Sequence, residues 1–356
     1  MDLLATAARA LALPAGAIAL ERALTTHTRS DVAVAVVDRG ERLLVKKFLD
    51  GEAVSRFEAE LSCLEILSDY PSAPVAPLRG FDREHLVLVM TYLGDRTVED
   101  CLWVGDRQTA EELLQAYSRT VGLFHRLGRE ALPAIDAARR SRGYTPDQFW
   151  PPFAREDEAL KTGYVEHGDA PIESLGPELR RVVAETFWDE ATATLIQWDC
   201  WPGNAMQMRG HTPLIDLENS MQADPLLDVA SWHLCFPAAP LRSPWAAALP
   251  AHVVTEMDRT YEAATGESID TRRLALACAS RMQFELTASG GRKLISGQLP
   301  QRVRLLYAVR LEATAELCRN ASVLPTLAAS MAAIAAKARG TDLVDAHLNT
   351  YPALQT

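Results

Sequence analysis

The chain has 356 residues, enough for a sizeable hydrophobic core and for two domains or lobes. Its hydrophobic share of 48% and charged share of 23% are ordinary for a globular protein. The formal net charge of −11 excludes a general affinity for nucleic acid, which needs a basic surface. An acidic protein of this kind favours a cationic small molecule as its substrate.

The cysteines and the apolar segments indicate the cellular compartment of the protein. The six cysteines show no CxxC spacing, which argues against a zinc site and a disulfide framework and predicts reduced thiols in the cytoplasm. The apolar N-terminus lacks a basic segment, begins with Asp2 and is interrupted by Pro14. We therefore expect an N-terminal helix followed by a strand. No stretch approaches the ~20 apolar residues of a membrane span, so no membrane partner is expected.

A strand and a helix are predicted in the first hundred residues. Leu43, Val45 and Phe48 indicate a half-buried strand with Lys46 and Lys47 near its end. Because side chains alternate along a strand, only one of the two lysines can face a cleft, and the alternative for either is a solvated strand end. Apolar residues then recur at helical spacing and predict an amphipathic helix packed on a sheet. These residues are Phe57, Leu61, Leu64 and Leu67.

Further elements follow in order. The pattern predicts a strand from His85 to Tyr92, a turn at Gly94 and a helix that begins near Thr97. The next helix carries His125 on an apolar face, which is typical of a hydrogen-bonded core histidine.

Between residues 147 and 178 lies a dense run of acidic residues with aromatic residues among them. Such a run is either a solvated face or a region that attracts a cationic substrate. Four further helices are predicted between 256 and 340, and a tail begins near Thr341.

The segment QWDCWPGNAM carries the strongest chemical pattern. Asp199 and Asn204 are separated by four residues, and a second carboxylate, Asp216, follows in TPLIDLEN. We expect a buried strand that ends at Leu195–Ile196 and a second short strand at Leu214–Ile215, which together present two carboxylates and an amide at one edge. Mg²⁺ prefers such hard oxygen ligands, and phosphoryl transfer needs a base beside them.

The run QWDCWPGNAM, followed by PLIDLENSMQADPLLDVASW, resembles the signature of the aminoglycoside phosphotransferase family, small-molecule kinases with the protein-kinase fold. Members of this family carry H-G-D-x-x-x-x-N, an apolar-apolar-Asp-Trp/Leu-Glu segment and G-D-P-x-x-D-x-A. The resemblance covers roughly Leu24 to Trp232. Gln197 stands where the family has a histidine that packs and hydrogen-bonds in the catalytic loop.

The resemblance implies a role for each matching residue. Asp199 would accept the proton of the attacking hydroxyl, and Asn204 and Asp216 would bind Mg²⁺. Lys46, chosen over Lys47 by the family pattern, would pair with Glu60 and hold the α- and β-phosphates. The supporting residues would be Asp228, which braces the catalytic loop, and Gln197.

The remaining expectations concern the nucleotide site. Thr91 and Leu93 would contact adenine through the main chain. Thr28, Arg29 and Ser30 lie in a glycine-free loop that would cover the phosphates or be a polar hairpin loop only. The role of Glu218 stays open: it either supports the metal site or is a surface carboxylate. Glu58 and Glu65 are expected to be solvated.

The resemblance implies an α+β, protein-kinase-like fold with a β-rich N-lobe at residues 1–93, a helical C-lobe at 94–340 and a tail at 341–356. It implies phosphorylation, with ATP or GTP and Mg²⁺, of a hydroxyl on an aminoglycoside-like or other antibiotic, and hence antibiotic resistance. Two alternatives stay open. One is a metabolite kinase acting on choline, homoserine, a sugar, a nucleoside or a biosynthetic intermediate, and the other is a non-catalytic, pseudokinase-type binding protein.

Overall fold

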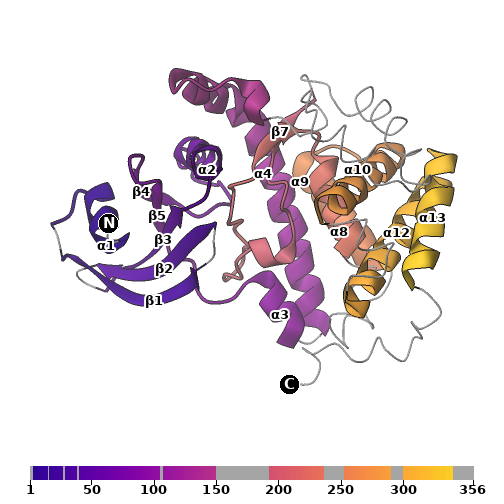
Figure 1. Ribbon diagram of the computed structural model, residues 1–356, viewed down its shortest axis with the longest axis horizontal. Helices are drawn as coiled ribbons and strands as arrows, with labels where there is room; N and C mark the ends of the chain where they lie inside the picture. The colour runs from indigo at the N-terminus through magenta and orange to yellow at the C-terminus, as the bar shows by residue number, and fades with distance from the viewer. Residues whose placement is uncertain are drawn as a thin grey trace.

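The computed structural model describes residues 3–14, 16–26, 29–37, 40–104, 107–149, 192–235, 252–289 and 300–339. These residues form a mixed α+β fold with a small sheet-containing N-lobe and a larger helical C-lobe (Figure 1). The expected two-lobed architecture is confirmed. The tail predicted from 341 and most of the acidic run between 147 and 178 lie outside the described residues.

The N-lobe is built on one antiparallel sheet of five strands in the order β1-β2-β3-β5-β4. The strands are β1 Ile18–Thr26, β2 Ser30–Val37, β3 Arg42–Phe48, β4 Leu78–Asp82 and β5 Val87–Thr91. The strand expected from His85 begins only at Val87, because Leu86 turns the chain out of β4 with a left-handed φ of 53°. β4 was not expected, and it pairs with β5 at the edge of the sheet.

Two helices cover the two faces of this sheet. Helix α1 (Leu3–Ala10), the expected N-terminal helix, packs with Leu43 and Val45 in one apolar cluster. Helix α2 (Ala53–Leu67) lies on the other face, where the Phe57 ring meets the Phe48 ring edge-on at 5.8 Å between centroids. Because side chains alternate along β3, Lys46 shares the α2 face with Phe48.

The C-lobe contains the predicted helices. They are α3 Val98–Val104, α4 Arg107–Ser141, α8 Leu226–Cys235, α9 His252–Thr265, α10 Thr271–Ser289, α12 Gln301–Asn320 and α13 Pro325–Arg339, with a 3₁₀ turn η1 at Pro146–Phe149. Helix α4 runs along the side of the lobe that faces the sheet, and α12 and α13 lie at the far end (Figure 1). No helix in the described ranges is both long and apolar enough to cross a membrane.

The hairpin that carries the catalytic pattern differs from the expectation. Strand β6 (Thr194–Ile196) is present as predicted, but it pairs with β7 (Met221–Ala223). The second strand predicted at Leu214–Ile215 is wrong: Leu214 makes only isolated bridges, to Val75 and Ala205. The backbone between β6 and β7 turns back through a short 3₁₀ helix, η2 (Pro202–Asn204), so Leu214 has no continuous strand beside it.

Helix α4 anchors the start of this hairpin. A Cβ at Gly128 would lie 2.8 Å from Leu195 Cβ, so only glycine allows β6 to approach the helix this closely. The Thr194 hydroxyl donates a 2.6 Å hydrogen bond to the carbonyl of His125 on the same helix. The buried helix therefore fixes the position from which the catalytic loop begins.

Candidate active site

A cleft of about 600 Å³ lies between the sheet and the 204–218 segment of the C-lobe. Its walls come from β1, β2, β3, the hinge after β5 and the segment after η2. Of the residues expected to bind nucleotide or metal, those lining the cleft are Ser30, Lys46, Glu60, Thr91, Leu93, Asn204 and Asp216. Thr28 lies outside the described residues.

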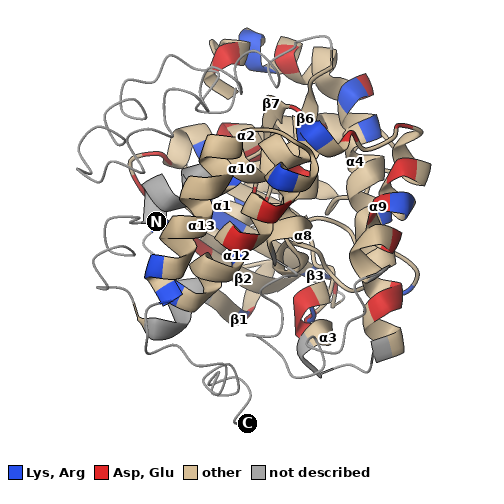
Figure 2. Cartoon of the chain, turned by 90° about the vertical axis from the view of Figure 1, so that its right-hand side faces the viewer, with Lys and Arg blue, Asp and Glu red and all other residues tan. Residues whose placement is uncertain are grey.

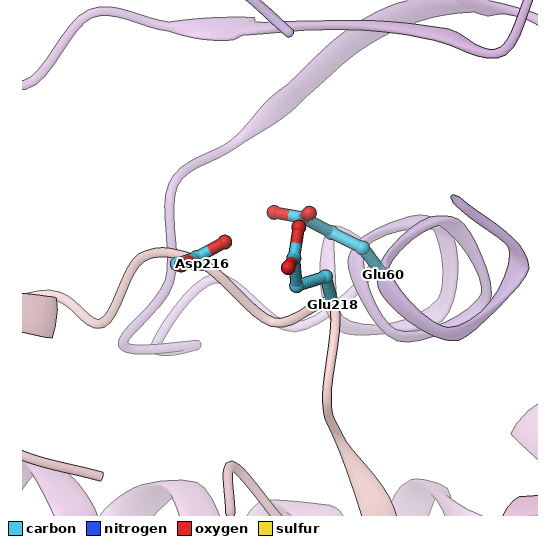
Figure 3. Close-up of side chains that lie close together, drawn as sticks. All are labelled: Glu60, Asp216 and Glu218. Atoms are coloured by element: carbon cyan, nitrogen blue, oxygen red, sulfur yellow. The ribbon is translucent and has the colours of Figure 1, made fainter. Parts of the chain in front are cut away.

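Lys46 lies at the centre of a carboxylate cluster at the inner end of the cleft. Its Nζ is 2.7 Å from Glu60 Oε2, 2.5 Å from Asp216 Oδ1 and 2.9 Å from Glu218 Oε2. Figure 3 shows the three carboxylate side chains converging from α2 and from the 216–218 segment. The structure thus brings Lys46 and Glu60 together, while Lys47 lies on the other face of β3 and is half-buried.

Burial and charge act in opposite directions in this cluster. Burial lowers the pKa of Lys46, but attraction to Glu60, Asp216 and Glu218 outweighs it and raises the pKa above its ordinary value. Burial also raises the pKa of Glu60, and the ammonium of Lys46 opposes this change. Lys46 is therefore a permanent cation held by acidic groups, which suits it to bind phosphate oxygens.

Glu218 is part of this cluster and is not the surface carboxylate considered above. Only 9% of its side chain is exposed, and it lies 3.1 Å from Arg56 Nη1 on α2 and 3.4 Å from Arg29 Nη2. Arg29 directly precedes β2 in the glycine-free loop, and its carbonyl accepts a hydrogen bond from Arg56. Ion pairs therefore hold the start of β2 over the inner end of the cleft.

The expectation for Glu58 is also wrong, because this residue is buried. Its carboxylate pairs with Arg83 and with Arg142 of the C-lobe, each at 3.2 Å. Glu65, two helical turns away and partly exposed, contacts Arg142 as well. Glu58 was expected to be solvated from its position in the helical pattern. Its burial is explained by ion pairs with Arg83 and Arg142, which are distant in the sequence.

The hinge brings main-chain groups of Thr91 and Leu93 to the edge of the cleft. The N–H of Thr91 donates to the carbonyl of Pro77 at 2.9 Å, so this N–H is not free to bind a ligand. Leu93 lines the cleft, and no hydrogen bond of its N–H is found among the described residues. At the outer edge, Arg22 of β1 contacts both Tyr92 and Asp95 and thereby joins the sheet to the hinge.

Asp199 and Asn204 lie side by side in the catalytic loop. Asn204 Nδ2 donates to the carbonyl of Asp199 at 2.9 Å and to its Oδ2 at 3.1 Å. Burial raises the pKa of Asp199, and the nearby guanidinium of Arg281 opposes that change. The amide of Asn204 therefore orients the carboxylate of Asp199, and no hydrogen bond of its Oδ1 is found within the part of the chain that the structure describes.

Asp228 holds the backbone of this loop from the first turn of α8. Its Oδ2 accepts from the N–H of Gln197 at 2.7 Å, and its Oδ1 accepts from the N–H of Trp198 at 2.8 Å. His125 Nε2 lies 3.1 Å from Oδ2, and His125 Nδ1 lies 2.9 Å from the Tyr261 hydroxyl. The buried histidine is thus a satisfied core residue, as predicted.

Gln197 links the catalytic loop to the Asp216 segment. Its Nε2 donates a 2.6 Å hydrogen bond to the carbonyl of Ile215, directly before Asp216. Its Oε1 is buried without a hydrogen-bond partner among the described residues. The amide of Gln197 therefore links the catalytic loop to the Asp216 segment without a titratable group.

Trp198 is a feature of the loop that the sequence interpretation missed. It stands where the H-G-D motif has glycine, and its φ of 66° lies in the left-handed region that favours glycine. The sequence QWDC could have indicated this feature. A tryptophan at a position that usually holds glycine implies either a different backbone conformation or contacts that hold the tryptophan in a left-handed one. Arg281 of α10 supplies contacts to this residue.

The donor set of the cleft fits a magnesium ion. Asn204 and Asp216 offer hard oxygen atoms, and 37% of the Asp216 side chain is exposed. The Glu60, Asp216 and Glu218 carboxylates also lie close enough together to surround a cation. Glu60 and Glu218 are buried and held by Lys46, and Glu218 also pairs with Arg56, whereas Asp216 is partly exposed to the cleft. We therefore assign the ion to Asn204 and Asp216 in the proposal below.

Fold and cleft together define a protein-kinase-like phosphotransferase. The sequence profile of the phosphotransferase enzyme family matches residues 25–276, so the chain belongs to that family and is a small-molecule phosphotransferase. A search of the curated proteins finds no match to this sequence.

Solved structures share the fold at low identity. Amicoumacin kinase hAmiN, solved with AMP-PNP, Ca²⁺ and amicoumacin, is 14% identical with a TM-score of 0.54, over 85% of this chain and 89% of its own. A choline/ethanolamine kinase family protein from Mesorhizobium loti is 15% identical with a TM-score of 0.53, over 92% and 97%. Macrolide 2′-phosphotransferase MphH from Brachybacterium faecium is 15% identical with a TM-score of 0.51, over 87% and 98%.

Proposed function

We propose that this phosphotransferase transfers the γ-phosphoryl group of ATP or GTP to a hydroxyl of a small molecule, an aminoglycoside-like or other antibiotic, in the cytoplasm. The proposal depends on one observation: a paired lysine and a group of carboxylate and amide side chains face each other across one cleft. Lys46 is paired with Glu60 at 2.7 Å, and Asn204 beside Asp199 lies with Asp216 in the opposite wall. Phosphoryl transfer requires both a fixed cation for the phosphates and a carboxylate for the hydroxyl.

In the proposed mechanism each residue has a distinct role. Glu60 fixes Lys46, whose ammonium exchanges its contact with Asp216 for the α- and β-phosphate oxygens of the nucleotide. The carbonyl of Thr91 and the N–H of Leu93 bind the base. Asp199, oriented by Asn204, accepts the proton of the acceptor hydroxyl as that oxygen bonds to the γ-phosphorus. The bond from the γ-phosphorus to the bridging oxygen breaks, and the nucleoside diphosphate leaves.

Asn204 Oδ1 and the Asp216 carboxylate would hold Mg²⁺ in this arrangement. The ion, when bound, neutralises negative charge on the phosphates. Ser30 at the start of β2 lines the cleft and, with Arg29, could reach the outer phosphates, and Thr28 is assigned the same role from the sequence alone.

The acceptor is proposed from charge. The net charge of −11 favours a cationic compound, and the acidic run between 147 and 178 is the segment most suited to attract it. Charged residues of both signs are interspersed along α4 and α9 (Figure 2), so the acidic excess is not concentrated on these helices. An amino sugar antibiotic combines positive charge with several hydroxyl groups, which matches both requirements.

The test is a screen for release of ADP from MgATP, or of GDP from MgGTP, against aminoglycosides, macrolides, choline, homoserine, nucleosides and sugars, with Asp199→Asn as the matched inactive control. We expect release with a cationic antibiotic, and kcat/KM should fall as salt rises, because exposed charges are screened beyond ~8 Å at physiological ionic strength. Release with a metabolite alone would replace the antibiotic by that metabolite. Nucleotide binding without release for any acceptor would indicate a pseudokinase.

A further inference from the structure

The backbone at the catalytic aspartate makes a strained turn. The N–H of Asp199 donates to the carbonyl of Gln197 at 2.9 Å, which closes a three-residue γ-turn around Trp198. With a φ of 66° at its centre, the turn is the form that is rare and strained for any residue with a Cβ. Such a conformation persists only where the surrounding structure holds it.

Asp228 and Arg281, both outside the turn, hold Trp198 in place. Asp228 accepts its N–H at 2.8 Å, as described above. Arg281, which lies 83 residues away on α10, donates from Nη1 to the carbonyl of Trp198. The same guanidinium lies over the Trp198 ring, with 4.8 Å between Cζ and the ring centroid. A cation that stacks on a ring and bonds to the carbonyl of the same residue restrains both side chain and backbone.

We propose that Arg281 is a positioning residue: its guanidinium holds Trp198 in the left-handed γ-turn and thereby fixes the direction in which Asp199 points. A glycine at position 198 would adopt this turn without help, because it has no Cβ to conflict with the backbone. The tryptophan in this chain therefore needs a support, and the stacked arginine supplies it. The inference rests on the proposed phosphoryl transfer only for its kinetic measurement.

The experiment compares Arg281→Met in three backgrounds: the native Trp198, Trp198→Ala and Trp198→Gly. Alanine retains the strain of a left-handed residue without the ring, whereas glycine removes the strain. Arg272→Met, at an exposed position in the first turn of α10, is the matched control. Turnover is measured as ADP release from MgATP with water as acceptor, together with the KM for MgATP and the melting temperature of each variant.

With the native Trp198 or with alanine, Arg281→Met should lower kcat roughly tenfold, the size of effect that the ordinary cost of a left-handed residue allows. The KM for MgATP should change less than about twofold, because Lys46 and the hinge do not depend on the turn. In the glycine background, Arg281→Met should change kcat less than about twofold when each variant is measured on the alkaline plateau of its pH–rate profile, where Asp199 is ionised with or without the nearby guanidinium. An equal loss in all three backgrounds, or no loss with the native Trp198, would overturn the proposal.

A second measurement does not depend on activity. Hydrogen–deuterium exchange of the peptide at 194–204 should become faster in Arg281→Met with the native Trp198, and the substitution should add no further increase in the glycine background. If no variant, including the wild type, releases ADP, the proposed function fails while this exchange pattern still tests the positioning role. Unchanged exchange in Arg281→Met with the native Trp198 would reject the positioning role itself.

Discussion

Replacing Asp228 by alanine tests the claim that a buried carboxylate organises the catalytic loop. The substitution removes the acceptor of two backbone N–H groups, those of Gln197 at 2.7 Å and Trp198 at 2.8 Å, and the partner of His125. All of these groups surround a side chain that is fully buried. Alanine offers no replacement acceptor, and water has no direct access to this position.

The magnitude follows from the cost of an unsatisfied buried donor, about 1–3 kcal/mol each. Two N–H groups without an acceptor would lower the free energy of unfolding by about 2–6 kcal/mol. Part of this loss is offset, because the variant no longer has to bury the Asp228 carboxylate. We expect a net loss of about 2–4 kcal/mol, which a domain of ordinary stability, about 5–15 kcal/mol, survives at 25 °C. The folded variant should have strongly reduced kcat, because the γ-turn before Asp199 loses the carboxylate that accepts the N–H of Trp198.

Urea denaturation followed by circular dichroism measures the stability, and ADP release measures kcat. Asp258→Ala is the matched control, because Asp258 accepts bonds from Trp232 and His233 at 2.9 and 3.0 Å but is partly exposed. Its loss should cost about 1 kcal/mol or less. If Asp228→Ala cost no more than the control and retained wild-type kcat, the bracing argument would be refuted.

The other predictions concern the cleft. Lys46→Met should weaken MgADP binding in calorimetry while Lys47→Met should not, and equal effects would reject the assignment of Lys46. Asp199→Asn should lower kcat by ~10²–10⁴-fold at nearly unchanged nucleotide affinity. Since burial raises the pKa of Asp199, wild-type kcat should fall on acidification at a pH above the usual range of an aspartate. Asp216→Ala should weaken nucleotide binding in Mg²⁺ titrations, and wild-type binding would argue against a metal ligand. Gln197→His should change activity modestly without a new essential ionisation in the pH–rate profile; activity in the His variant alone would favour a pseudokinase.

The sequence by itself determined the local elements and the spacing of the chemical groups. The alternation on β3 showed that Lys46 and Lys47 face opposite ways. The spacing of Asp199 and Asn204, read with the apolar residues before it and Asp216 after it, predicted a catalytic loop. These features depend on neighbours within a few residues, and strand and helix periodicity report such neighbours directly. The family profile and the two-lobed fold agree with that interpretation.

Only the tertiary structure decided how distant residues meet. It paired β6 with β7, and it buried Glu58 and Glu218 against arginines. It also placed Arg281 on Trp198 across 83 residues of sequence. Whether a charge is solvated or buried depends on which opposite charge the fold brings to it, and no periodicity within a single element carries that information.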